Sequence, residues 1–80
     1  MPKAIVRDNE FIKIFGERVK SLREQREWSV YYLAKISGIS RNQIHLIEKG
    51  SINTNISVIP ILCEAFEIEI TVLMSLDYSI

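Results

Sequence analysis

Two short helix signals separated by a tight corner, between Trp28 and Gly50, constrain the fold more than any other feature of the sequence. Ala34 lies four residues before Gly38, where only a small side chain lets two helices touch. Ile44 lies six residues after Gly38, where a branched apolar side chain fills the angle between the helices. A corner this tight needs a small residue before it and a glycine in it. The spacing therefore predicts two short helices packed at a steep angle.

Capping residues and apolar spacing extend this pair to five helices in an all-α chain. Serines precede the two short helices and glycines follow them, because a serine hydroxyl caps a helix N-terminus and glycine accepts the left-handed conformation that closes a C-terminus. Asn9 is expected to cap the first helix, and Pro60 fits only a first turn, so the fourth helix should start late or bend there. The expected helices cover residues 10–26, 30–37, 41–49, 56–66 and 71–76.

The outward face of the third expected helix is polar. Its inward positions, Ile44 and Ile47, are three residues apart. The residues that this leaves facing outward near the helix N-terminus are Arg41, Asn42, Gln43 and His45. Arg, Asn and Gln carry the paired donors and acceptors that match guanine and adenine edges in the major groove. Recognition helices reach bases with their N-terminal residues, so the pattern predicts a helix that reads duplex DNA.

Residues 28–50 thus form a helix-turn-helix, and with its flanks this unit resembles the DNA-binding domains of the phage Cro and lambdoid-repressor type, also called the xenobiotic-response-element family. The matching segments are Arg18–Glu24, Trp28–Lys35, Ser37–Arg41, Ile44 and Ile47–Gly50. The likeness covers about residues 14–74. It implies a compact five-helix, lambda-repressor-like fold with the helix-turn-helix at helices two and three. It also implies a repressor-like transcriptional regulator that binds operators as a homodimer.

Together, the residue types and the resemblance predict which residues touch DNA. The expected base contacts are Arg41, Asn42, Gln43, His45 and Leu46, of which Arg41 and Asn42 hold the positions that read bases first. The expected phosphate contacts are Ser29, Val30, Tyr31, Ser40, Asn53 and Asn55. Tyr31 would contribute through its hydroxyl. The plain alternatives are that Tyr31 is an exposed packing residue and His45 a solvated one.

The sequence departs from the family at several of these positions. Val30 stands where relatives often have Gln, Leu46 cannot hydrogen-bond a base, and the 51–55 segment carries no cation. Fewer phosphate contacts predict weaker binding with a shallower dependence on salt. These departures favour an alternative function, a protein-interaction module on the same fold such as an antitoxin or a bridging factor. The Arg41-Asn42-Gln43 run favours sequence-specific binding of double-stranded DNA.

The resemblance extends to the scaffold of the fold. Arg23 and Glu48 match the family's ion pair, which ties the first helix to the end of the third. The alternative is two solvated charges that contribute little to stability. Glu27 and Glu67 stand where many relatives have Gly after the first and fourth helices. A left-handed conformation at either glutamate would cost about 1 kcal/mol.

Charge is distributed unevenly along a chain whose formal net charge is zero. All ten Lys and Arg residues lie within residues 1–49, whereas residues 50–80 hold four acidic residues and no base. A basic first half suits a polyanionic partner, although chance segregation on so short a chain gives the same pattern. The pI near 6.6 is well below that of a strong nucleic-acid binder.

The C-terminal end is expected to hold two copies of the chain together. A single helix-turn-helix covers only a few base pairs, and so few cations are not enough to hold a monomer on DNA at physiological salt. The apolar residues at this end exceed what a domain this small buries alone, and an exposed apolar patch usually marks an interface. The expected interface residues are Leu73, Met74, Leu76, Tyr78 and Ile80.

Other classes of function are disfavoured by what the sequence lacks. One His and one Cys cannot assemble a metal site or a Cys/His nucleophile, so we expect no enzyme, no metal and no cofactor. The longest uncharged apolar run is residues 58–63 and the N-terminus has no secretory segment, so we expect a cytoplasmic protein without a membrane span. The expected organisation is an N-terminal arm at 1–9, a DNA-binding domain at 10–76 and a tail at 77–80.

Overall fold

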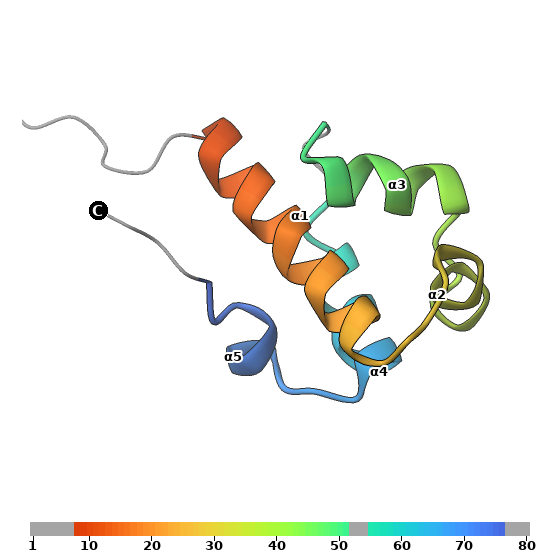
Figure 1. Cartoon of the computed structure of the whole chain (residues 1–80). Coiled ribbons are helices and arrows are strands. Elements are labelled where there is room, and N and C mark those ends of the chain that lie inside the picture. The colour runs from red at the N-terminus through yellow and green to blue at the C-terminus, as the bar shows by residue number, and fades with distance from the viewer. Residues whose placement is uncertain (1–7, 52–54, 77–80) are drawn as a thin grey trace, which may run out of the picture.

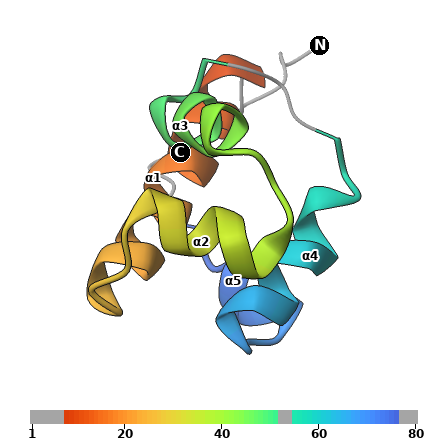
Figure 2. The same cartoon turned by 90° about the vertical axis from the view of Figure 1, so that its right-hand side faces the viewer.

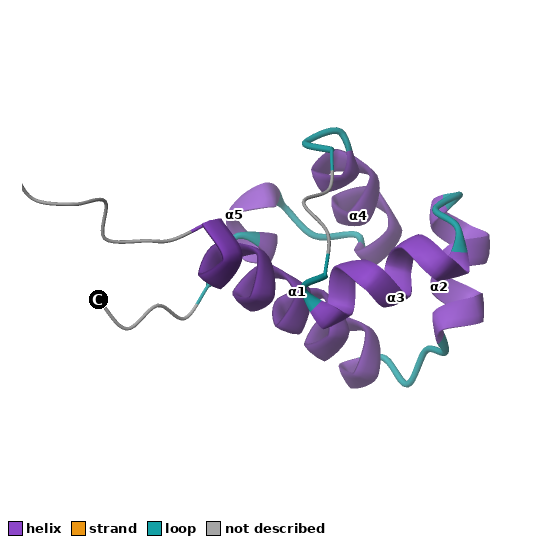
Figure 3. Cartoon of the chain, turned by 90° about the horizontal axis from the view of Figure 1, so that it is seen from above, coloured by secondary structure: helices purple, strands orange, loops and turns teal. Residues whose placement is uncertain are grey.

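The computed structural model describes residues 8–51 and 55–76, and it places five helices and no strand among them. In chain order the helices are α1 (Asp8–Gln25), α2 (Val30–Ser37), α3 (Arg41–Lys49), α4 (Val58–Phe66) and α5 (Ile70–Leu73) (Figure 1). Seen from above, only helices joined by short loops are present in this part of the chain (Figure 3). The predicted all-α, five-helix fold is confirmed.

The helices enclose one apolar core. Every helix contributes to it, and Leu33, Leu62 and Leu73 are completely buried. The buried side chains are Phe15, Val19, Leu22, Leu33, Ile39, Ile44, Ile47, Val58, Leu62, Phe66 and Leu73. Helix α2 packs against both α3 and α4, while α3 also packs along α1 (Figure 2). This packing fixes the orientation of α3, whose outward face therefore has a defined position on the molecule.

The corner between α2 and α3 has the predicted caps. The hydroxyl oxygen of Ser29 accepts a hydrogen bond from the amide of Tyr32 at 2.9 Å, and the hydroxyl oxygen of Ser40 accepts one from the amide of Gln43 at 3.1 Å. Gly38 and Gly50 close the two helices in the left-handed conformation, with φ of 80° and 70°. The expected bounds of both helices are confirmed.

Of the other helices, α1 and α5 differ from expectation at their ends, whereas α4 has the expected late start and ends at Phe66 as expected. Helix α1 spans Asp8–Gln25, so Asn9 lies inside the helix and is not its cap. Helix α4 begins at Val58, two residues after residue 56, which places Pro60 in its first turn and confirms the late start expected from the proline. A turn precedes it, in which the amide of Val58 donates to the carbonyl oxygen of Asn55. Helix α5 spans Ile70–Leu73 rather than residues 71–76.

Glu67 is the residue at which we expect a substitution to stabilise the fold. It closes α4 at φ 58° and ψ 49°, and Glu27 has the same left-handed conformation at φ 57°. Because glycine adopts this region without the Cβ penalty, Glu67→Gly should raise the free energy of unfolding by about 1 kcal/mol in urea denaturation. The matched control is Glu64→Gly inside α4, which should lower it by about 1 kcal/mol. Equal losses in the two variants would contradict the prediction.

Candidate nucleic-acid interface

The N-terminal half of α3 presents a polar face to solvent. Ile44 and Ile47 are almost completely buried and hold the helix against the core. Arg41, Asn42 and His45 are exposed, whereas Gln43 and Leu46 are half-buried. The five residues predicted to contact bases therefore lie on one short helix, and three of them are exposed. The major groove of DNA is wide enough to admit an α-helix. Helix α3, nine residues long, is held against the core with its polar face outward and could enter such a groove.

The corner at residues 38–40 joins the C-terminus of α2 to the N-terminus of α3, and the contact between Tyr31 and Arg41 links the first turns of the two helices. Ser29 and Ser40 are exposed and cap the two helices, so each hydroxyl keeps its own proton to donate. Val30 packs partly against the core, and only its amide is directed to the helix end. First-turn amides have no partner within a helix, and with the helix dipole they favour phosphate. These amides can bind phosphates without a contribution from the Val30 side chain.

Tyr31 and Arg41 are in direct contact. The guanidinium carbon of Arg41 lies 5.6 Å from the centroid of the Tyr31 ring, and the Tyr31 side chain is 61% exposed. The two residues line a shallow depression together with Ala34 and Lys35. Lys35 is an exposed cation at this face that the sequence argument missed, although its position four residues after Tyr31 on α2 was the available signal.

The loop after α3 is described only in part. Asn55 is exposed, and its carbonyl oxygen accepts the turn hydrogen bond from the amide of Val58 at 3.0 Å. Asn53 lies outside the described residues. The carbonyl oxygen of Leu46 accepts a hydrogen bond from the amide of Ser51 at 2.9 Å, which fixes the exit of the chain from α3. Of the two predicted phosphate contacts in this loop, only Asn55 can therefore be placed, and it is exposed.

An ion pair ties α3 to α1. The Arg23 Nε donates to Glu48 Oε2 at 2.8 Å and its Nη2 donates to Oε1 at 3.0 Å, while Nη1 donates to the carbonyl oxygen of Trp28 at 2.7 Å. The two side chains are only 12% and 6% exposed. The hydrogen bonds that Arg23 donates to the Glu48 carboxylate raise the pKa of Arg23, against the opposing effect of burial. The pair joins the end of α1, the entry to α2 and the last turn of α3.

Helices α1 and α3 also approach each other closely at a glycine. A Cβ at Gly16 would lie 2.1 Å from the carbonyl oxygen of Ile47 and 3.1 Å from that of Glu48. Real Cβ atoms do not come this close to backbone oxygen, so only glycine permits the observed packing. The close approach and the ion pair both involve the last turn of α3, at Ile47 and Glu48, and together they fix how α3 lies against α1. No pattern in the sequence distinguishes Gly16 from a glycine that could be replaced.

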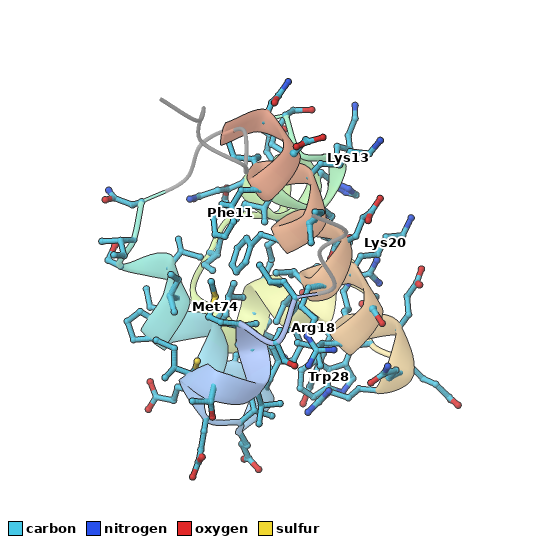
Figure 4. All side chains as sticks on the ribbon, turned by 90° about the vertical axis from the view of Figure 1, so that its left-hand side faces the viewer. Phe11, Lys13, Arg18, Lys20, Trp28 and Met74 are labelled. Atoms are coloured by element: carbon cyan, nitrogen blue, oxygen red, sulfur yellow. The ribbon has the colours of Figure 1, made fainter. Side chains whose placement is uncertain are left out.

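The burial of the C-terminal residues agrees only in part with the predicted dimer interface. Leu73 is completely buried in the core, so it is not available to a partner and its assignment to a dimer interface is wrong. Met74 and Leu76 are half-buried, and Tyr78 and Ile80 lie outside the described residues. The Arg18 side chain extends from α1 on the side of the molecule where Met74 lies (Figure 4). Its guanidinium donates to the carbonyl oxygen of Val72 at 2.7 Å, which ties α5 to α1.

The apolar side chains that α5 does expose are Ile70 and Val72, with 55% and 43% of their surface accessible. The apolar run of residues 70–74 does not by itself indicate which residue faces the core.

Within residues 8–51 and 55–76, no cluster of three His, Cys, Asp or Glu side chains is placed to hold a metal ion. Burial raises the pKa of the Cys63 thiol. No helix in the same part of the chain has the length and apolar character needed to cross a membrane.

Comparison with protein families and curated proteins gives a consistent result. A family model described as a helix-turn-helix domain matches residues 16–79. The chain is 33% identical over 55 residues to the antitoxin PezA of Streptococcus pneumoniae, covering 69% of this chain and 35% of the antitoxin. It is 39% identical over 57 residues to a Pyrococcus furiosus protein named as an HTH-type transcriptional regulator, covering 71% of this chain and 18% of that protein. The chain thus spans about a third or less of these relatives.

A solved structure is similar over nearly its whole length. The restriction-modification controller protein C.AhdI of Aeromonas hydrophila superposes with a TM-score of 0.74 and 32% sequence identity. The superposition covers 81% of this chain and 97% of the controller protein. The similarity includes the order and packing of the helices, which agrees with the arrangement that the sequence predicts.

Proposed function

This chain belongs to the helix-turn-helix domain family, and from that premise we propose that it is a repressor-like regulator that binds specific double-stranded DNA with α3 in the major groove. The single observation that carries the proposal is the outward face of α3, where Arg41, Asn42 and His45 are exposed while buried Ile44 and Ile47 fix the helix. Residues 10–76 form the DNA-binding domain in this proposal, and the site of action is the cytoplasm. We propose no catalytic role.

The exposed side chains suit different parts of a DNA site. Arg41 can donate two hydrogen bonds to guanine O6 and N7, and Asn42 can pair with adenine N6 and N7. Gln43 and His45 extend the base contacts, and half-buried Leu46 suits a thymine methyl group. The phosphate contacts that we propose are Ser29, the amides of Val30 and Tyr31, Lys35, Ser40, Asn53 and Asn55. Phosphate contacts position the protein, and base contacts supply its specificity.

Arg41→Ala is expected to lose about 1–3 kcal/mol of binding free energy on the preferred duplex and to relax selectivity at one base pair. Selection from random duplexes, followed by binding assays on the selected site and its single-base variants, measures both effects. Lys35→Ala is the matched control, since a phosphate contact weakens binding to all sequences alike and reduces the salt dependence. An unchanged selected motif in Arg41→Ala would contradict the assignment of Arg41 to base reading.

We also propose that the working form is a two-fold dimer. Two copies about 34 Å apart would place their α3 helices in successive major grooves on one face of the duplex. The exposed Ile70 and Val72 on α5, with half-buried Met74 and Leu76, provide the apolar surface for the contact. Tyr78 and Ile80 remain predicted members of the interface.

Ile70→Lys combined with Val72→Lys is expected to convert the dimer to a monomer, because each lysine would bring a charge into an apolar contact. Sedimentation at tens of micromolar measures the change, with the unmodified chain sedimenting as a dimer. Ile56→Lys, an exposed apolar position outside α5, serves as the control and should remain dimeric. A monomeric unmodified chain, or a dimeric double variant, would remove this interface.

A second candidate function is a protein-interaction module. The similarity to an antitoxin favours it, as does an open groove between α2 and α4 lined by the exposed side chains of Tyr32, Ile36 and Ile61. In this role the chain would bind a protein partner and would have weak or no DNA affinity. Failure to select any DNA motif, with the fold intact, would favour this candidate over DNA reading.

A further inference from the structure

We propose that Tyr31 is a positioning residue that sets the base selectivity of Arg41, a role that rests on the proposed reading of DNA by α3. The two residues belong to different helices, α2 and α3, and the corner at residues 38–40 brings them together. The guanidinium carbon of Arg41 lies over the Tyr31 ring, 5.6 Å from its centroid. Positively charged groups are attracted to the negative face of an aromatic ring at this distance.

The ring is the partner that orients Arg41 before DNA is bound. The ion pair formed in the described part of the chain joins Arg23 to Glu48 and does not involve Arg41. An exposed arginine otherwise samples many rotamers, and ordering it on binding costs free energy. A ring face attracts the guanidinium but does not occupy its N–H groups in conventional hydrogen bonds. Arg41 is therefore held in place with its donors free for a guanine edge.

This role differs from the one expected from the sequence, in which the Tyr31 hydroxyl contacts a phosphate. Positioning requires the aromatic ring and not the hydroxyl, whereas a phosphate contact requires the hydroxyl and not the ring. Tyr31→Phe keeps the ring, and Tyr31→Leu removes it while keeping an apolar side chain. The two variants therefore separate the two roles. Tyr32→Leu is a matched control, because Tyr32 lies next in the helix but its ring packs against Trp28.

The first measurement compares these variants on the selected duplex and on the duplex changed at the base pair that Arg41 reads. Tyr31→Phe should keep the discrimination between the two duplexes, and Tyr31→Leu should reduce it about two- to fivefold, the range for a cation–π contact at an exposed site. Tyr32→Leu should leave it unchanged. In an Arg41→Ala background, Tyr31→Leu should have no further effect on discrimination, because the residue through which it acts is gone.

The second measurement needs no DNA. The ring should shift the NMR resonances of the Arg41 side-chain Nε–H and Cδ protons in the free protein. We expect that shift in the unmodified chain and in Tyr31→Phe, and its loss in Tyr31→Leu. If the unmodified chain selects no DNA motif, the proposed function fails, and this measurement still shows whether the ring holds Arg41.

Two results would overturn the positioning role. Equal loss of affinity on all duplexes in Tyr31→Phe and Tyr31→Leu would assign the effect to the hydroxyl and a phosphate. Unchanged discrimination in Tyr31→Leu, while Arg41→Ala loses it, would show that Arg41 reads its base without help from the ring.

Discussion

Replacing Glu48 with glutamine is expected to lower the free energy of unfolding by about 3 kcal/mol, the lower end of the range for breaking a buried ion pair from one side, because this pair is part-buried. The carboxylate accepts two hydrogen bonds from Arg23, at 2.8 and 3.0 Å, and both side chains are nearly enclosed. Without the carboxylate, the Arg23 charge stays in that enclosed position with only the exposed Glu24 as an acidic neighbour. The loss should appear in urea denaturation and as a lower melting temperature.

Glu24→Gln is the control for this prediction. Glu24 is also an acidic neighbour of Arg23, but it is exposed on α1, and exposed charge pairs contribute about 0.2–1 kcal/mol. The two variants remove the same charge near the same arginine and differ in burial. If Glu48→Gln melts like the unmodified chain, Arg23 and Glu48 are effectively solvated and do not hold α3 to α1.

Gly16→Ala is expected to destabilise the fold by about 3 kcal/mol, the upper part of the range for inserting a methyl group into a packed interior. The added Cβ would lie 2.1 Å from the Ile47 carbonyl oxygen, a backbone atom that cannot rotate away. Helices α1 and α3 would have to separate, and the tilt of α3 would change with them. Without the clash, alanine would stabilise the helix by about 1 kcal/mol relative to glycine. A loss of stability in Gly16→Ala would therefore be due to the clash.

Gly38→Ala provides the comparison, because nothing lies within 4 Å of a Cβ there and only its φ of +80° opposes the change. We expect Gly38→Ala to cost about 1 kcal/mol and Gly16→Ala clearly more. Both free energies come from urea denaturation. A Gly16→Ala protein as stable as the unmodified chain would mean that α1 and α3 are farther apart than described.

The corner of the helix-turn-helix could be predicted because its determinants are local. Ser29, Ser40 and the two glycines at helix ends act on neighbouring backbone groups, and the apolar residues between them follow the helical period. The N-terminus of α1 lacks such a signal, since Asp8 and Asn9 both suit a helix start. At α5 the apolar run from Ile70 to Met74 has no polar residue other than Thr71 to show which side faces the core.

The contacts that place the site could be predicted only in part. The family resemblance pointed to Arg23 and Glu48 together, and the structure pairs them. The close approach at Gly16 and the contact between Tyr31 and Arg41 depend on how separate helices pack, and no local pattern encodes that distance. The burial of Leu73 and the hydrogen bond from Arg18 to the Val72 carbonyl oxygen likewise depend on how α5 packs against α1 and the core. These features are contacts between separate helices, and the periodicity of apolar residues along the sequence does not predict them.

Selection from random duplex DNA with the full unmodified chain, at low and at moderate salt, tests the reading of DNA by α3 most directly. The proposal predicts one enriched motif with two half-sites about one helical turn, 10–10.5 base pairs, apart, and an affinity that falls with salt less steeply than for strongly basic binders. A folded chain that enriches no motif at either salt concentration, or that binds every duplex equally, would contradict it.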